Sequence, residues 1–453
     1  MNSLLLIGLT VIFSLIVARL ILKKYNAIFV FFASGIVIML AANALTGTPI
    51  LGKTTMGSPL LDVFGFLSQS FKTNIANIGM IIMMVTGYAA YMKHIQASTK
   101  LAYLASNPLS KIRNKYLVLS GMYLVGMALK LVITSQAGLS VLLLATVFPV
   151  LMAIGISPIT SASVLSLICI DYGPNDGSTI FMSGVLQMNV VDLFLKHQLA
   201  VAGSIIAVMA VLIPFYYKYM DNRDKSRGTY QAQEITKLDN PDVPTYYALL
   251  PVIPLAIVFA DYFIPSTKID VITANIMGMF ITFVIEFCRR SDRSEIPKDV
   301  VVILRAMADI FVSVVAIIIS ASCFAQGIKM LGGISIFAHY AAGMEGAVFI
   351  IMLVLALITF LFAVIMGSGA APLFAFGSLT PEIASKLGVP AVTLILPMEI
   401  ASALGRATSP VCGAVIAVAG VAGIEPIQLV KRSAPMLVLA FIVNCVASYI
   451  FNI

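Results

Sequence analysis

The chain has 453 residues, of which 60% are hydrophobic and only 11% carry a charge. Soluble domains carry roughly 25% charged residues, so this composition excludes a soluble enzyme or a soluble binding module. The net charge is +8, but the excess lies in a few loops between apolar segments, which is typical of cytoplasmic loops and not of a nucleic-acid-binding surface.

Ten apolar segments reach the length of about 20 residues that crosses a bilayer. In chain order, the predicted spans are 3–22, 26–44, 74–92, 158–192, 199–218, 246–264, 270–288, 301–326, 390–422 and 433–452. No basic residue precedes the first span and no small-residue cleavage site follows it, so it is predicted as a true span with its N-terminus outside. The polar run 219–245 is predicted as a cytoplasmic linker between two halves, 1–218 and 246–453.

Two further apolar segments, 116–153 and 346–386, each contain a short polar tip. The tips read TSQAG at 134–138 and GSGAA at 367–371. A continuous helix has no use for such an interruption, whereas a hairpin that enters and leaves the membrane on one side places its turn there. Non-helical backbone at membrane depth is tolerated where protein or a water-filled cavity satisfies it. Both segments are therefore predicted as re-entrant hairpins.

The basic residues favour this topology. With both hairpins in place, eighteen of the 28 Lys and Arg residues fall in inside loops, six in outside loops and four within the apolar segments. If 116–153 crossed the membrane, the loops that follow it would change sides and this asymmetry would disappear. The same count puts both termini outside.

The two halves repeat one order of elements: three spans, a hairpin, a broken span and a final span. Ser135 and Ser368, in the two tips, each lie 20 residues before a glycine turn. The long spans break at 171–179 (DYGPNDGST) and 405–410 (GRATSP), and the offset between halves stays near 233. The first half starts outside and the second inside, so the fold predicted is all-α with two inverted repeats. Such repeats with discontinuous helices are typical of secondary transporters.

Arg406, at the second break, is the most informative charged residue. An arginine midway through a membrane is costly, so it normally faces a cavity or a partner. Its planar guanidinium suits a carboxylate held by two hydrogen bonds. Two interpretations stay open: Arg406 binds a carboxylate of the substrate, or it forms an internal ion pair with Asp171, Asp176 or Glu399.

The hairpin tips and the second break supply the other candidate substrate ligands. Helices that begin after each tip add partial positive charge, which favours an anion. Simple hairpin turns are the alternative interpretation of either tip alone. The candidates are Thr134, Ser135, Gln136, Gly138, Gly367, Ser368, Gly369, Thr408 and Ser409.

Possible cation coupling is assigned to four polar residues: Asp171, Asn175, Asp176 and Glu399. Unwound carbonyls beside them suit Na⁺, and the carboxylates suit a proton. Lys130 lies one turn before the first tip and is predicted to neutralise Asp171. The cysteines have no metal-ligand spacing, and no catalytic or nucleotide-binding motif is present, so neither a metal, a cofactor nor an enzyme activity is expected.

Several motifs resemble those of one transporter family. They are YAAYMKHIQAS at 88–98, TSQAGLSVLLLATVFP at 134–149, MGSGAAPLFAF at 366–376, ALGRATSPV at 403–411 and LVKRSAPM at 429–436. The chain is similar to the DcuC and DcuD types of anaerobic C4-dicarboxylate carrier. The resemblance implies a bacterial inner-membrane carrier of succinate, fumarate and related dicarboxylates. It also implies a homodimer in which an elevator-like domain moves against a scaffold formed by 1–92 and 246–326.

The function expected is therefore secondary transport of C4-dicarboxylates by exchange, cation-coupled uptake or efflux. The rivals on the same fold are a carrier of another small organic anion or amino acid, and a Na⁺/H⁺ antiporter that uses Asp171 and Asp176. A channel or an intramembrane enzyme is disfavoured, because paired hairpins in inverted repeats are not needed by a channel and no nucleophile–base pair is evident. The partners expected are the lipid bilayer and the substrate, with no nucleic acid.

Overall fold

The computed structural model describes residues 3–452 except 24, 52–54, 107–113, 147, 228–240, 265–268, 291, 334–335 and 337–345. Within these ranges the regular secondary structure is entirely helical, as the sequence predicts. Seven of the helices described are long and apolar enough to cross a membrane. The two broken spans are not among them, because each is divided into short helices.

The first half contains twelve labelled helices and two π-helical turns. They are α1 (Ser3–Leu22), α2 (Ala27–Thr46), α3 (Pro59–Asn74), a π turn (Ile75–Gly79), α4 (Met80–His94), α5 (Ala97–Ser106), α6 (Lys115–Lys130), α7 (Gln136–Thr146), α8 (Phe148–Ala153), α9 (Pro158–Ser166), α10 (Gly177–Leu186), α11 (Val190–Leu193), a second π turn (Phe194–Gln198) and α12 (Leu199–Ser226).

The second half begins with a 3₁₀ helix, Thr245–Val252. Its further elements are α13 (Ile253–Phe263), α14 (Val271–Arg289), a 3₁₀ turn (Arg293–Glu295), α15 (Ile296–Ile310), a π turn (Phe311–Val315), α16 (Ala316–Leu331), α18 (Ala347–Met366), α19 (Ala370–Gly377), α20 (Thr380–Leu387), α21 (Val392–Ala407), α22 (Gly413–Val421) and α23 (Pro426–Asn452).

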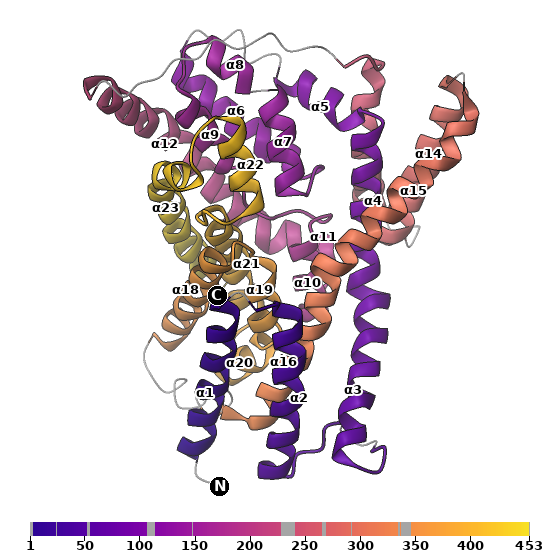
Figure 1. Ribbon diagram of the computed structural model, residues 1–453, viewed down its shortest axis with the longest axis vertical. Helices are drawn as coiled ribbons and strands as arrows, with labels where there is room; N and C mark the ends of the chain where they lie inside the picture. Colours follow the sequence, from indigo (N-terminus) through magenta and orange to yellow (C-terminus); the bar gives the residue numbers. More distant parts are fainter. Residues whose placement is uncertain are drawn as a thin grey trace.

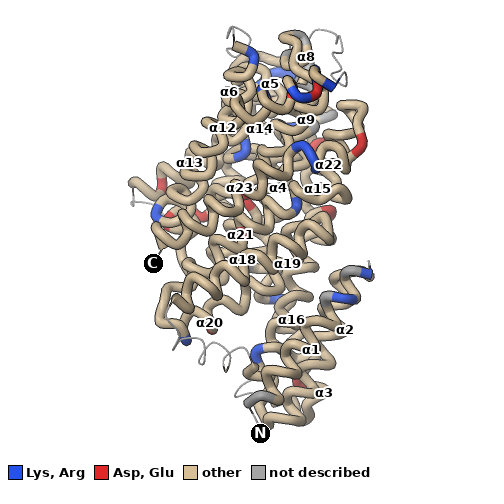
Figure 2. The backbone as a smooth tube through the Cα atoms, turned by 90° about the vertical axis from the view of Figure 1, so that its left-hand side faces the viewer, with Lys and Arg blue, Asp and Glu red and all other residues tan. Residues whose placement is uncertain are grey.

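The helices form two groups (Figure 1). In the first helix group, which comprises α1–α4 and α13–α16, α2 packs along α16 while α4 packs along α14 and α15. In the second helix group, which comprises α6–α12 and α18–α23, α21 packs on α18 and α23, and α12 packs on α6 and α23. Lys and Arg gather mainly at the end that holds α5, α6 and α8 (Figure 2).

Glycines allow the closest helix crossings. A Cβ placed on Gly35 of α2 would lie 2.6 Å from the backbone carbon of Cys323 in α16. A Cβ on Gly405 of α21 would collide with the backbone oxygen of Phe360 in α18. Small residues let helix backbones approach where lipid supplies no hydrophobic force between helices.

Two spans are longer than predicted. The helices at 59–94 and 296–331 replace the predicted spans 74–92 and 301–326. Polar residues near the ends of these helices shorten the apolar segment that hydropathy detects. The helix itself begins next to a residue that can cap it. Ser58, for example, accepts a hydrogen bond from the Leu61 amide and caps α3. Each long helix contains one π turn, and the turns at 75–79 and 311–315 contact each other.

The broken spans divide close to the predicted positions. The first is non-helical at 167–176, where the prediction was 171–179, because Asp176 caps α10 and so makes Gly177 helical. The second is non-helical at 408–412, where the prediction was 405–410, and Arg406 therefore lies in the last turn of α21. A cation is favoured there by the negative end of the helix dipole.

The two predicted hairpins differ from each other. Residues 131–135 join α6 to α7, and these helices contact each other. Gly367–Gly369 joins α18 to α19, but α18 has 20 residues and is long enough to cross a membrane. Re-entry on one side, and the opposite orientation of the two halves, stay predictions.

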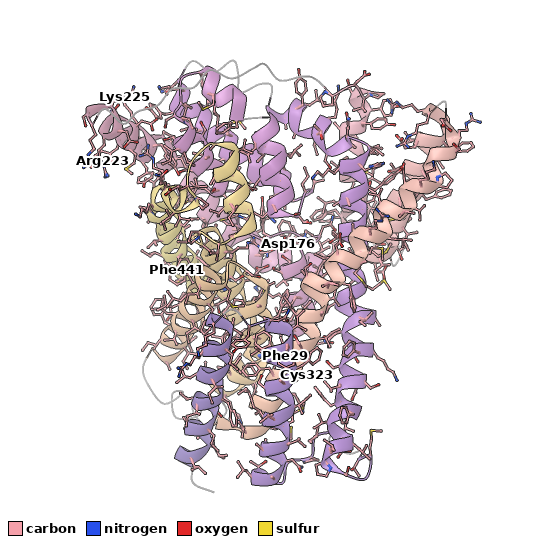
Figure 3. The ribbon with its side chains drawn as sticks, viewed as in Figure 1. Phe29, Asp176, Arg223, Lys225, Cys323 and Phe441 are labelled. Carbon is pink, nitrogen blue, oxygen red and sulfur yellow. The ribbon has the colours of Figure 1, made fainter. Side chains whose placement is uncertain are left out.

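The predicted linker 219–245 begins later than the sequence suggests. Helix α12 continues to Ser226, with Arg223 and Lys225 near its free end (Figure 3). The extension is held because Asp221 is wholly buried and accepts a hydrogen bond from Arg432 of α23 at 2.8 Å. Residues 228–240 lie outside the described part of the chain.

Candidate functional site

A cavity of about 390 Å³ lies between the two helix groups. Its wall from the second helix group, called the polar wall below, holds every charged side chain of the lining together with apolar residues such as Phe374 and Ala414. Its wall from the first helix group is almost wholly apolar. The polar lining includes Thr134, Ser135, Gln136, Asp171, Asn175, Asp176, Ser178 and Arg406. The opposite lining is Ile82, Val85, Thr86 and Ala89 of α4 with Ile310 and Val314. Asp176 lies near the middle of the molecule (Figure 3), so the cavity lies well away from both ends.

Four charges balance one another at the polar wall. The Lys130 ammonium lies 3.0 Å from Asp171 Oδ1 and 3.3 Å from Asp176 Oδ2. Arg406 Nη2 donates to the same Asp171 oxygen at 3.0 Å. Lys130 also donates to the Thr134 carbonyl, which ties it to the first tip. The prediction that Lys130 and Asp171 neutralise each other is confirmed.

Arg406 makes one of the two interactions considered from the sequence, the internal ion pair, and its binding of a substrate carboxylate stays a prediction. It forms the internal ion pair with Asp171, and its Nη2 also donates to the Cys169 carbonyl at 3.3 Å. Its side chain nevertheless keeps 20% of its surface exposed and lines the cavity. Its buried Nε has no hydrogen-bond partner among the described residues. The guanidinium can therefore also bind an anion in the cavity.

The first tip presents polar atoms to the cavity. The Ser135 hydroxyl accepts from the Gly138 amide at 3.1 Å, so it caps the start of α7. Gln136 is buried, and its Oε1 accepts no hydrogen bond from the described residues. Gly138 is not among the described residues that line the cavity. Its amide donates the hydrogen bond of this cap.

In the second tip, only Gly367 of the predicted ligands lines the cavity. Gly367 has φ +68°, a left-handed conformation that favours glycine. A Cβ on Gly369 would lie 2.8 Å from the Ser402 carbonyl oxygen, so this glycine permits close packing on α21. Ser368 is half-buried and, within the described part, does not line the cavity.

The predicted ligands at the second break lie behind the cavity wall. The Thr408 hydroxyl donates to the Leu404 carbonyl at 2.8 Å, back into its own helix. Ser409 is wholly buried and accepts from the Val411 amide at 3.4 Å. Their role in substrate binding stays a prediction.

The coupling candidates occupy two places. Asp171, Asn175 and Asp176 line the cavity, and the Asn175 side-chain oxygen accepts no hydrogen bond from the described residues. Glu399 is wholly buried behind them, where Gln198 and Thr179 hold its carboxylate. No cluster of His, Cys, Asp and Glu in the described ranges is suited to a metal ion.

Sequence reasoning missed several contributors. The apolar wall from α4 and α15 carries no local signal, because its residues look like any lipid-facing residues. Ser178 lies within the predicted break and lines the cavity, but it is not among the predicted ligands. Gln198 was also missed, although a side-chain amide within an apolar segment indicates a buried polar site.

Comparison with known proteins identifies relatives over the whole chain. The family model of DcuC, described as a C4-dicarboxylate anaerobic carrier, matches residues 5–452. The anaerobic C4-dicarboxylate transporter DcuC of Escherichia coli K12 is 34% identical over 450 residues, which cover 98% of this chain and 96% of that protein. A probable DcuC of Vibrio cholerae is 33% identical over 441 residues, or 96% of this chain and 95% of that protein.

Two solved transporter structures share the fold. MtrF of Neisseria gonorrhoeae, from a class of antimetabolite efflux pumps, has a TM-score of 0.60 at 12% identity and covers 94% of each chain. The YdaH transporter of Alcanivorax borkumensis has a TM-score of 0.61 at 12% identity, covering 93% of this chain and 97% of that one. At this identity the likeness concerns the fold alone.

Proposed function

The chain belongs to the DcuC family of C4-dicarboxylate anaerobic carriers, and on that premise we propose that it carries succinate-, fumarate- and malate-type dicarboxylates. It is a multi-pass inner-membrane transporter and not an enzyme. The observation that carries the substrate proposal is the guanidinium of Arg406, which faces a cavity lined also by both hairpin tips. One substrate carboxylate binds Arg406, and the other lies near the tips.

The volume and chemistry of the cavity support a small anion. About 390 Å³ falls within the range of roughly 300–1,000 Å³ usual for small-molecule sites. The amides and hydroxyls of Thr134, Ser135 and Gln136 sit where α7 begins, and a helix start favours negative charge.

Charge balance makes coupling necessary. Lys130 and Arg406 are matched by Asp171 and Asp176, so the empty cluster is neutral and a bound dianion brings two uncompensated charges. Moving each charge against an inside-negative potential costs about 2.3 kcal/mol per 100 mV. Transport therefore proceeds by exchange for another dianion, or with co-transported Na⁺ or H⁺ in uptake or efflux. Asp171, Asn175, Asp176 and Glu399 are the candidate coupling residues.

An elevator-like movement fits a cavity with one polar and one apolar wall. The second helix group carries every charged lining residue, and the described lining from the first helix group is uncharged. Sliding the polar wall along the apolar wall would move the substrate without separating it from its ligands. We also propose a homodimer with periplasmic termini, which size measurement and terminal-tag accessibility will test.

The test is exchange in liposomes. Purified protein should take up labelled succinate against internal fumarate, and Arg406→Ala should abolish this uptake. Arg305→Ala is the matched control, because Arg305 is an exposed arginine on α15. Both variants must elute as folded protein. Movement of an amino acid, a monocarboxylate or Na⁺ and H⁺ alone, with Arg406→Ala silent, would refute the proposal.

A further inference from the structure

A second buried acid lies directly behind the cavity. Glu399, on α21, is wholly buried. Its Oε1 accepts from the Thr179 hydroxyl at 3.0 Å and from Gln198 Nε2 at 3.0 Å, and its Oε2 accepts from Gln198 Nε2 at 2.8 Å. Every one of these donors is neutral.

Among the described residues, no cation forms an ion pair with Glu399. The basic groups of the cavity wall, Lys130 and Arg406, are paired with Asp171 and Asp176. Helices α10, α18 and α19, which pack against α21, contain no ionisable side chain. The remaining neighbours contribute Glu382 and Lys386 of α20, Lys431, Arg432, Cys445 and Tyr449 of α23, and Lys196 and His197 of the π turn. Of these, Arg432 is held by Asp221 and Asp224, Lys196 by Asp192, and His197 by Asn452.

A buried carboxylate with no cation carries a large desolvation cost, which favours the binding of a proton. The hydrogen bonds from Thr179 and Gln198 act in the opposite direction, because they stabilise the ionised form. A hydroxyl can reverse its direction and accept from a protonated acid. The site thus has partners for Glu399 in both protonation states.

Gln198 connects Glu399 to the substrate cavity. Its Oε1 accepts from the Gly173 amide at 3.0 Å, while its Nε2 binds Glu399. Gly173 lies in the break 167–176, which also carries Asp171 and Asp176. Thr179 lies beside Ser178, which lines the cavity, so the first turn of α10 separates Glu399 from cavity water.

We propose that Glu399 is the proton-binding residue of this carrier and that one proton moves with the dicarboxylate in the same direction. A dianion in the cavity adds negative charge close to Glu399 and favours its protonated form. Protonation then alters the bonds of Gln198 and, through them, the break that holds Asp171. The proton is exchanged with cavity water across the first turn of α10, where the Thr179 hydroxyl hydrogen-bonds the carboxylate, and it returns to water on the other side of the membrane. This inference rests on the proposed dicarboxylate transport.

The experiment separates exchange from proton-driven flux in the same liposomes. Exchange of labelled succinate for fumarate at equal pH tests the proposed function. Net succinate uptake driven by an acidic exterior tests the coupling. Glu399→Gln mimics the protonated acid, so the ratio of proton-driven uptake to exchange should fall to background. Glu425→Gln, which changes an exposed acid immediately before α23, should leave the ratio at the wild-type value.

A second measurement covers the case in which Glu399→Gln does not fold. Wild-type protein in weakly buffered detergent solution, followed with a pH indicator, should take up protons when succinate is added. Exchange without proton uptake, or net uptake driven by Na⁺ at uniform pH, would overturn the role of Glu399 while dicarboxylate transport stood. Failure of exchange itself would overturn the proposed function instead.

Discussion

At the residue scale, Lys130 is wholly buried and its positive charge is shared by Asp171 and Asp176. Arg406 supplies the second positive charge on Asp171. In a low-dielectric interior, such charges are tolerated only when each has a partner. The four charged side chains of the polar wall are therefore preorganised and together electrically neutral.

Removing one member of this cluster should be harmful, and removing a matched pair should be tolerated. Lys130→Met leaves Asp176 without a cation and should lower stability by about 3–5 kcal/mol. Lys130→Met with Asp176→Asn keeps Arg406 on Asp171, and Asn can still cap α10. Thermal unfolding in detergent should find the double variant more stable than Lys130→Met. Additive losses would contradict the charge-balance argument.

At the element scale, one buried ion pair fixes the charged end of the second helix group. Asp221 of α12 accepts from Arg432 of α23 and from Ser157 at 3.1 Å, next to α9. Arg432 also bonds Asp224 at 2.8 Å. The pair thus joins α12 and α23 to the start of α9, and it explains why α12 continues beyond the predicted end of its span.

Arg432→Met should destabilise this joint, because Asp221 then keeps only neutral hydrogen-bond donors. The expected cost is about 3–5 kcal/mol, the usual penalty for breaking a buried pair. Lys431→Met is the matched control, because Lys431 precedes Arg432 in the chain but is exposed. Melting temperatures of the two purified variants test this. Equal melting temperatures would show that the buried ion pair does not stabilise the packing of these helices.

At the scale of the whole molecule, the proposed transport requires the two helix groups to move past each other. Gly184 of α10 and Ile78 of the first π turn bring the groups into contact: a Cβ on Gly184 would lie 2.7 Å from Ile78 Cδ1. Gly87 and Ile303 make a comparable contact within the first helix group, at 2.9 Å. The two contacts provide a test and its control.

Paired cysteines at 78 and 184 should stop exchange when oxidised, and a reductant should restore it, because the disulfide holds the groups together. Paired cysteines at 87 and 303 should form a disulfide without loss of exchange. Mass spectrometry under oxidising conditions verifies both cross-links. Full exchange by the oxidised 78–184 variant would exclude relative movement of the groups at this contact.

The sequence by itself determined the membrane class, most of the spans, the polar tips and the approximate breaks. These features follow from local chemistry: apolar length, and the small polar residues that interrupt a helix. It also indicated Asp171, Lys130 and Arg406 as partners, because buried charges need opposite charges. The sequence did not give the ends of α3, α12 and α15, because hydropathy detects the apolar segment and not the full length of the helix.

The tertiary structure alone decided which distant groups meet. Gln198 reaches Glu399 across 201 positions, and Arg432 reaches Asp221 across 211. It also decided that α4 and α15 form the apolar wall, and that Gly138 and Gly369 serve a cap and a close crossing. The physical reason is that a local pattern states what a side chain needs, whereas only packing selects the group that meets that need.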